Sequence, residues 1–270
     1  MIGLRKEKAA LMGFDSHSEY VLDNTMAKTP ENVNELLNTI WEPGIEKAKG
    51  EVKALQDLIS SEGGNFKLAA WDWWHYSEKL RQEKFDFKEE EVKPYFSEDK
   101  VLQGAFEVAN KLFDITFEES ADLPKYRDNI KTFIVKDRNE KTIGIFYTDY
   151  TLRPNKGGGA WMSTFRDQSK FDGEIIPLVI NVCNFPPENA DGVSLLSFEQ
   201  VETLFHEFGH GLHGLLSEAQ YPSLSGTSVT RDYVEFPSQM MENWAREPEV
   251  IKTFAQHYQT GETIPDELLE

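Results

Sequence analysis

The hydrophobic and polar positions divide the chain into a helical first part and a mixed second part. Between 29 and 63, apolar side chains recur every three or four residues, as on one face of an amphipathic helix. Segment 29–31 supplies a capping threonine, a proline at the first helical position and an acid, and two glycines at 63–64 end the run. Pro43 is expected to kink or break this helix. A second helix is expected to begin in segment 71–76, whose aromatic rings we interpret as core between helices.

The pattern changes from helical spacing to alternation in the second part. The expected strands are 132–135, 142–147 and 178–182. A glycine-rich stretch at 155–161 lacks the Lys-Ser/Thr ending and the following helix of a phosphate-binding loop, so we expect a flexible loop or a turn at the sheet edge. The expected fold is therefore mainly α with a small β-sheet (α+β). Its domains are an N-terminal helical region, 1–98, and a second region, 99–270.

A helix with a well-marked start follows at Ser197, which forms a capping-box pattern with Gln200. Within it, His206 and His210 are four residues apart, so both imidazoles project from one face and can reach one ion. Glu207 lies beside such an ion, in reach of a water molecule but outside the set of ligands. We expect a metal site, because burying this set among Phe and Leu without a partner would be costly. The alternative is that they are ordinary polar residues at the rim of the helix.

A zinc hydrolase of this kind needs a third protein ligand. His213 shares the helix face but lies further along the helix. A carboxylate on a following helix fits better, and Glu235 stands among apolar neighbours, where acidic residues are rare unless they are paired or bound to metal. The residues alone leave Asp232, Glu235 and Glu242 as candidates.

Composition narrows the possible partners. The 270 residues include 28 Lys+Arg and 47 Asp+Glu, a net charge of −19 that would repel nucleic acid and an anionic membrane surface. The single cysteine, Cys183, excludes an internal disulfide and a thiolate-only zinc site. The start of the chain has no secretory pattern, and no run reaches about 18 apolar residues, so a cytoplasmic protein without membrane or nucleic-acid partners is expected. Nothing in the pattern indicates an oligomeric state.

Two segments carry a resemblance to a known family. Residues 205–213 read Phe-His-Glu-Phe-Gly-His-Gly-Leu-His, and 225–244 contain Ser-Gly-Thr and then Asp-Tyr-Val-Glu-Phe-Pro-Ser-Gln-Met-Met-Glu-Asn-Trp. Together they resemble the thimet oligopeptidase family of zinc peptidases. The Gly-Gly-Ala-Trp stretch at 158–161 and Trp-Asp-Trp-Trp at 71–74 are most similar to the bacterial peptidyl-dipeptidases within it. The resemblance runs along essentially the whole chain.

This resemblance implies a zincin-like catalytic half with one Zn²⁺ per chain, bound by His206, His210 and Glu235. It implies that Glu207 is the general base and that Glu202, one turn before His206, orients that imidazole. Two further residues are expected close behind the ligands, His213 and Asp232. Those expected to contact substrate are Gly158, Gly159, Ala160, Trp161 and Gly226.

The implied reaction is hydrolysis of an oligopeptide that docks as an extra strand on the sheet edge. Glu207 would take a proton from a zinc-held water, which attacks the scissile carbonyl, and C-terminal dipeptides would be released. Members of the family resemble one another over a longer chain, and a further helix start at 263–267 stands just before the end of this one. We therefore expect a fragment. The alternative function is a catalytically incomplete zinc- or peptide-binding fragment, with oxyanion-stabilising residues lying beyond residue 270.

Overall fold

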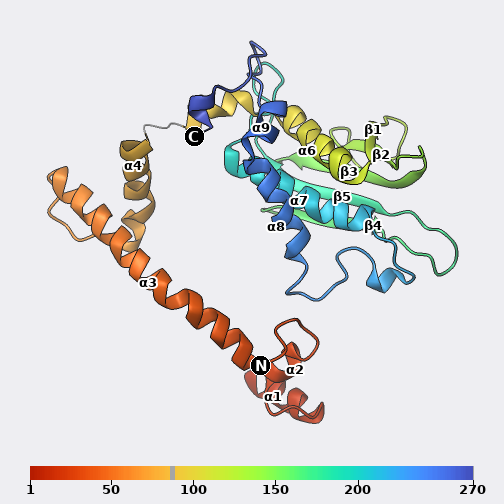
Figure 1. The fold of residues 1–270 in the computed structure, drawn as a ribbon, viewed down its shortest axis with the longest axis horizontal. Helices are drawn as coiled ribbons and strands as arrows, with labels where there is room; N and C mark the ends of the chain where they lie inside the picture. Colours follow the sequence, from red (N-terminus) through yellow and green to blue (C-terminus); the bar gives the residue numbers. More distant parts are fainter. Residues whose placement is uncertain (86–88, 270) are drawn as a thin grey trace. The chain divides into compact units, whose positions relative to one another are not determined.

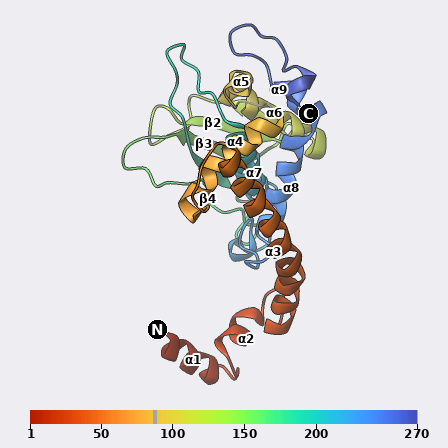
Figure 2. The same ribbon diagram turned by 90° about the vertical axis from the view of Figure 1, so that its left-hand side faces the viewer.

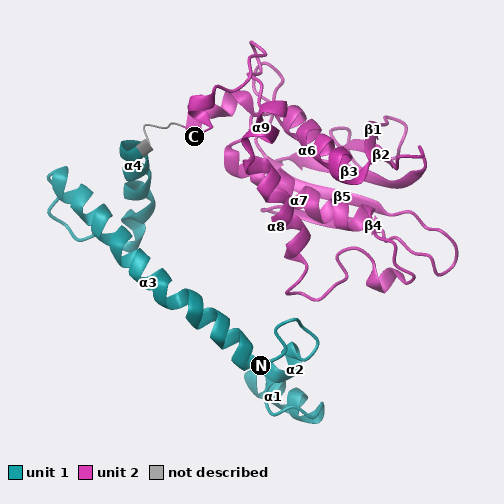
Figure 3. Ribbon diagram, in the orientation of Figure 1, with its two compact units in different colours: residues 1–88 teal, residues 89–270 magenta. Residues whose placement is uncertain are grey.

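The computed structural model describes residues 1–85 and 89–269 (Figure 1). The chain divides into two compact units, Met1–Lys88 and Glu89–Glu270 (Figure 3), a boundary that precedes the 98/99 division expected from the sequence. Among the described helices, none combines the length and apolar character needed to cross a membrane.

The regular elements of the first unit, in its described residues, are all helices. Its elements are α1 (Ile2–Leu11), α2 (His17–Leu22), α3 (Pro30–Ser61), the 3₁₀ turn η1 (Ala70–Asp72) and α4 (Trp73–Phe85). Helix α3 starts as expected, with the Thr29 hydroxyl accepting a hydrogen bond from the Asn32 N–H at 3.3 Å. It continues through Pro43 without a break, because a proline removes one backbone hydrogen bond while the turns on either side keep theirs.

The aromatic segment before and within α4 is more exposed than expected. Trp71 and Trp74 are 85% and 81% exposed, so the interpretation of these two rings as inter-helix core is wrong. Residues three apart share one helical face, and here that face is exposed. Tyr76 is half-buried, and its ring lies 6.2 Å from that of Phe66, a 45% exposed residue outside the helices.

The second unit combines helices with a five-stranded mixed sheet. Its helices are α5 (Glu89–Val92), η2 (Lys93–Tyr95), α6 (Glu98–Phe113), α7 (Phe198–Leu215), η3 (Pro222–Leu224), α8 (Glu235–Arg246), α9 (Pro248–Phe254) and η4 (Asp266–Leu268). Its strands are β1 (Thr116–Glu119), β2 (Lys131–Lys136), β3 (Thr142–Thr151), β4 (Trp161–Arg166) and β5 (Leu178–Phe185). The strand order is β1-β2-β3-β5-β4, with β3 and β5 parallel and the other neighbours antiparallel. The expected α+β class is confirmed.

Each face of the sheet carries its own apolar cluster. Helices α6 and α7 cover one face, where the rings of Phe106 of α6 and Phe208 of α7 have centroids 6.3 and 5.7 Å from that of Phe146 of β3. Side chains alternate along a strand, so the neighbours of Phe146 point to the other face. That face holds a second cluster, Ile130, Ile145, Tyr147, Ile180 and Val182. Buried on both faces, β3 and β5 form a rigid support beneath α7.

Candidate metal centre

The helix that bears the two histidines forms as its sequence predicts. Ser197 caps α7: its hydroxyl accepts a hydrogen bond from the Gln200 N–H at 3.2 Å, and the Gln200 side chain accepts one from the Ser197 N–H at 2.9 Å. Val201, Leu204 and Phe208 are fully buried on the face toward the core. Both histidines therefore stand on a helix that is fixed at its start and along its apolar face.

A glycine allows the next helix to approach α7 closely. Helices α7 and α8 lie side by side (Figures 1 and 2). A Cβ atom added at Gly209 would lie only 2.7 Å from the Ser238 Cα atom and 2.9 Å from the Pro237 carbonyl oxygen, both on α8. Only glycine fits such a backbone contact, and the approach brings the first turn of α8 against the histidines.

Three side chains converge at this helix pair. The Glu235 Oε2 atom lies 3.3 Å from His206 Nε2 and 3.0 Å from His210 Nε2, and the two imidazole rings have centroids 4.9 Å apart. One ligand atom of each residue lies within 4.8 Å of the other two. A shared zinc ion about 2 Å from each donor produces separations of this size, and two imidazole nitrogens with one carboxylate oxygen are a donor set that zinc prefers. The residues present therefore fit a zinc ion.

The supporting contacts differ in one respect from the expectation. The carboxylate that meets the second nitrogen of His206 belongs to Glu242, whose Oε1 atom lies 2.6 Å from Nδ1. Glu202, expected in this position, forms an ion pair with Arg246 instead. An i,i+4 spacing makes two side chains neighbours, but the strong cation on α8 attracts Glu202 away from the imidazole. The Ser238 hydroxyl donates a hydrogen bond to Glu235 Oε2 at 3.0 Å.

Glu207 occupies a different environment from Glu235. It is 6% exposed, and its Oε2 atom is buried with no hydrogen-bond partner among the described residues. Burial raises the pKa of Glu207 to about 7; the charge of His206 acts against this rise and that of Glu235 adds to it. A carboxyl group with a pKa near neutrality can both accept and return a proton.

The two ligand types are held in complementary protonation states. Burial lowers the pKa of His210, which favours the neutral imidazole that a metal requires. Partial burial acts to raise the pKa of Glu235, but the Ser238 hydrogen bond and the charges of His210 and His206 outweigh it and lower that pKa. Glu235 is therefore ionised and His210 neutral over the neutral pH range.

His213 and Asp232, expected close behind the ligands, lie further along α7 and before α8, and Gly226, expected to contact substrate, lies between them in the sequence. His213 and Gly226 line a mainly apolar cavity of about 340 Å³ at the C-terminal half of α7. Gly226 has φ = +53°, and a Cβ added there would lie 3.1 Å from the Gly214 Cα atom. Asp232 lies in the turn that precedes α8. The structure thus places Gly226 and His213 at one cavity, and neither belongs to the cluster of His206, His210 and Glu235.

The expected substrate residues Gly158, Gly159, Ala160 and Trp161 form a loop and the first residue of β4. We call residues 155–160 the Gly loop. It is fixed against β5, where the Asn184 side chain donates hydrogen bonds at 2.8 Å to the carbonyl oxygens of Gly157 and Gly159.

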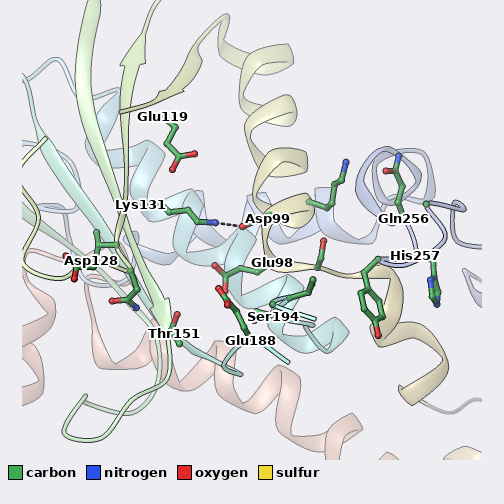
Figure 4. Close-up of a pocket in the computed structure, with 18 of the residues that line it drawn as sticks. Glu98, Asp99, Glu119, Asp128, Lys131, Thr151, Glu188, Ser194, Gln256 and His257 are labelled. Atoms are coloured by element: carbon green, nitrogen blue, oxygen red, sulfur yellow. Dashed lines mark hydrogen bonds and ion pairs between the residues drawn. The ribbon is translucent and has the colours of Figure 1, made fainter. Parts of the chain in front are cut away.

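A larger cavity, about 690 Å³, lies at the N-terminal end of α6 (Figure 4). Figure 4 shows Lys131 directed at Asp99, with which it forms an ion pair, and Glu98 beside Glu188. Burial raises the pKa of Glu98, opposed by the charge of Lys131. The acids here are accompanied by lysines and by His257, but among the described residues only His206, His210 and Glu235 bring three possible ligand atoms within reach of one metal ion.

Sequence reasoning missed the role of Glu242 and the existence of the Asn184 contacts. Glu242 follows Glu235 by seven residues, a spacing of two helical turns that places both on one face of α8 and was the available signal. Asn184 carried no signal, because its partners come from a loop 25 and 27 residues away.

The chain is similar to known peptidases along its whole length. The family model described as Peptidase family M3 matches residues 1–270. The chain is 41% identical over 269 residues to the dipeptidyl carboxypeptidase of Escherichia coli K12, covering 99% of this chain and 39% of that protein. It is 37% identical over 273 residues to oligopeptidase A of the same organism, covering 100% of this chain and 40% of that protein. It is 36% identical over 278 residues to an organellar oligopeptidase A of Arabidopsis thaliana, covering 99% of this chain and 35% of that protein. The chain thus spans about two fifths of the length of these curated relatives or less.

Proposed function

Because the chain belongs to peptidase family M3, we propose that it carries the metal centre and general base of a zinc peptidase of the zincin type. The reaction is hydrolysis of short peptides with release of C-terminal dipeptides. The observation that supports this is the convergence of His206, His210 and Glu235 on one point, with the buried carboxyl of Glu207 next to them. Family membership supports peptide hydrolysis in general, and the name of one relative supports the dipeptide product.

Zinc would be held by His206 Nε2, His210 Nε2 and a carboxylate oxygen of Glu235, and when bound it supplies a Lewis acid that polarises the scissile carbonyl and acidifies water. The chain's own residues prepare these donors. With the proton of His206 on Nδ1, the Glu242 carboxylate accepts a hydrogen bond from Nδ1–H, and this tautomer leaves Nε2 with a free lone pair. Ser238 restrains Glu235 through its hydroxyl.

Glu207 moves the proton. With a pKa near 7 in the metal-free chain, it is ready to take a proton from the attacking water and to deliver it to the leaving amine. Its Oε2 atom is buried without a hydrogen-bond partner among the described residues, which costs stability. A buried group with such a shifted pKa is typical of a catalytic site.

The peptide would dock on β4. This strand is the last in the sheet order, so one of its edges presents backbone N–H and C=O groups that an extended peptide can pair with. Met162 of β4 packs toward Gly214 of α7, which sets this edge alongside the helix that bears the metal ligands.

The test combines metal content with product analysis. We expect one zinc per chain, lost in His206→Ala and retained in His75→Ala, an exposed histidine of the first unit. We expect chelator-sensitive release of a C-terminal dipeptide from an N-blocked tetrapeptide, abolished in Glu207→Gln with zinc still bound.

Two outcomes would contradict parts of this proposal. Zinc at one per chain without cleavage favours the alternative, a zinc-binding fragment that is too incomplete for turnover, in line with its two-fifths coverage of the longer relatives. Equal zinc in His206→Ala and wild type would refute the metal centre itself.

A further inference from the structure

A buried ion cluster lies at the beginning of the Gly loop. Asp149, near the end of β3, is 1% exposed. Its carboxylate accepts hydrogen bonds from Arg153 at 2.6 and 2.8 Å, from the Tyr126 hydroxyl at 2.5 Å and from Lys156 at 3.1 Å. Burial acts to raise the pKa of Asp149, but these hydrogen bonds outweigh it and lower the pKa to about 2. Asp149 therefore stays ionised and offers a fixed anchor to the loop that follows it.

Lys156 contacts the Asp149 carboxylate and also the backbone of the sheet. The pairing of β3 with β5 shifts register between Asp149 and Thr151, and such a bulge disrupts the backbone ladder locally. The Lys156 ammonium donates to the carbonyl oxygens of Asp149 at 2.7 Å and Thr151 at 3.1 Å, and also to that of Cys183 in β5. Its side chain is only 3% exposed. A residue of the loop thus supplies donors to carbonyl groups of both strands at the bulge.

The middle of the loop is fixed from the other side. Asn184 in β5 donates to the carbonyl oxygens of Gly157 and Gly159, both at 2.8 Å. Gly159 has φ = +82°, a conformation in which a side chain would be strained. The Trp161 ring lies over Gly157, within 3.5 Å of where a Cβ would stand. The loop is therefore held at its start by Lys156 and in its middle by Asn184.

Strand β4 begins directly after this loop, at Trp161. The conformation of the Gly loop consequently determines where the free edge of β4 starts, and it acts on a peptide only through that edge. We propose that Lys156 and Asn184 are positioning residues for peptide docking: they hold the Gly loop in one conformation, so that β4 presents its backbone groups in fixed register to the main chain of an extended peptide.

This inference rests on the proposed function and adds two consequences to it. Because Lys156 and Asn184 act through the backbone groups of β4, they favour the binding of extended peptides irrespective of their side chains. Because neither residue belongs to the metal centre, disturbing them weakens peptide binding and leaves zinc binding unchanged.

The test compares two asparagines that each donate to backbone carbonyls. Asn184→Ala removes the two bonds to the loop, and Asn110→Ala removes a 3.1 Å bond to the Ile115 carbonyl at the end of α6. Both are made in the zinc-loaded Glu207→Gln chain, where turnover is blocked, and the dissociation constant of an N-blocked tetrapeptide is measured. We expect Asn184→Ala to raise it roughly tenfold, since two neutral hydrogen bonds are lost, and Asn110→Ala to leave it within about twofold.

Two further measurements separate positioning from general damage. Amide exchange in segment 155–166 should accelerate in Asn184→Ala while zinc content stays at the parent value. Lys156→Met should raise the peptide dissociation constant at least as much as Asn184→Ala does. Equal peptide affinity in Asn184→Ala and Asn110→Ala overturns the inference. If the Glu207→Gln parent itself binds zinc but no peptide, the proposed function fails, and the inference fails with it.

Discussion

Replacing Glu207 with glutamine should stabilise the metal-free chain, although it removes the general base. In the folded chain the pKa of Glu207 is raised from 4.5 to about 7. Between these values the folded state binds more protons than the unfolded state, so stability falls as the pH rises through this window. One pKa unit corresponds to about 1.4 kcal/mol, and a shift from 4.5 to about 7 therefore costs about 3 kcal/mol once Glu207 is fully ionised. Glutamine cannot ionise and avoids this cost.

The measurement is the unfolding free energy of α7 from hydrogen exchange in segment 198–215, with zinc removed by chelator. We expect Glu207→Gln to match wild type near pH 4.5 and to exceed it by up to about 3 kcal/mol at pH 8. Glu199→Gln, an exposed acid on the same helix, is the control and should change stability by less than about 0.5 kcal/mol at either pH. Adding zinc should shrink the Glu207→Gln advantage, because a nearby cation favours the carboxylate.

Two results would refute this reasoning. One is a difference between Glu207→Gln and wild type that does not change with pH, since it would show that ionisation is not the cause. The other is a glutamine variant less stable than wild type at pH 8, which would mean that the buried carboxylate has a stabilising partner.

Two further predictions concern the helix pair. Glu242→Gln should weaken zinc binding roughly 10- to 100-fold in competition with a chelator, because it perturbs the carboxylate contact to the His206 imidazole. Glu202→Gln should change zinc affinity little, because Glu202 pairs with Arg246 instead. Equal effects of the two variants would contradict the role of Glu242 as the partner of His206. Gly209→Ala should lower stability by about 1–3 kcal/mol in thermal unfolding, because its Cβ would meet the Ser238 backbone at 2.7 Å. Gly50→Ala in α3 has open space and should be neutral or stabilising by up to about 1 kcal/mol, so similar losses at both glycines would speak against close helix contact.

The strands show where sequence reasoning succeeded and failed. The cores of β2, β3 and β5 follow from their apolar runs, because burial on both faces leaves an unmistakable pattern. Strands β1 and β4 were not predicted individually. They lie at the two edges of the sheet and leave most of their residues exposed, so their identity as strands comes from backbone pairing with a neighbour rather than from their own composition.

The sequence by itself determined helix α7, its capped start and the spacing that puts His206 and His210 on one face, because these are local properties of 3.6-residue periodicity. Its residues alone narrowed the third donor to a few acids, and the family resemblance then singled out Glu235. The tertiary structure placed Glu235 at the two Nε2 atoms and set Glu242, not Glu202, against His206. These contacts join two helices whose separation depends on the close packing at Gly209. A spacing along the chain fixes which side chains share a face, but only packing between elements fixes which side chain of another element meets them.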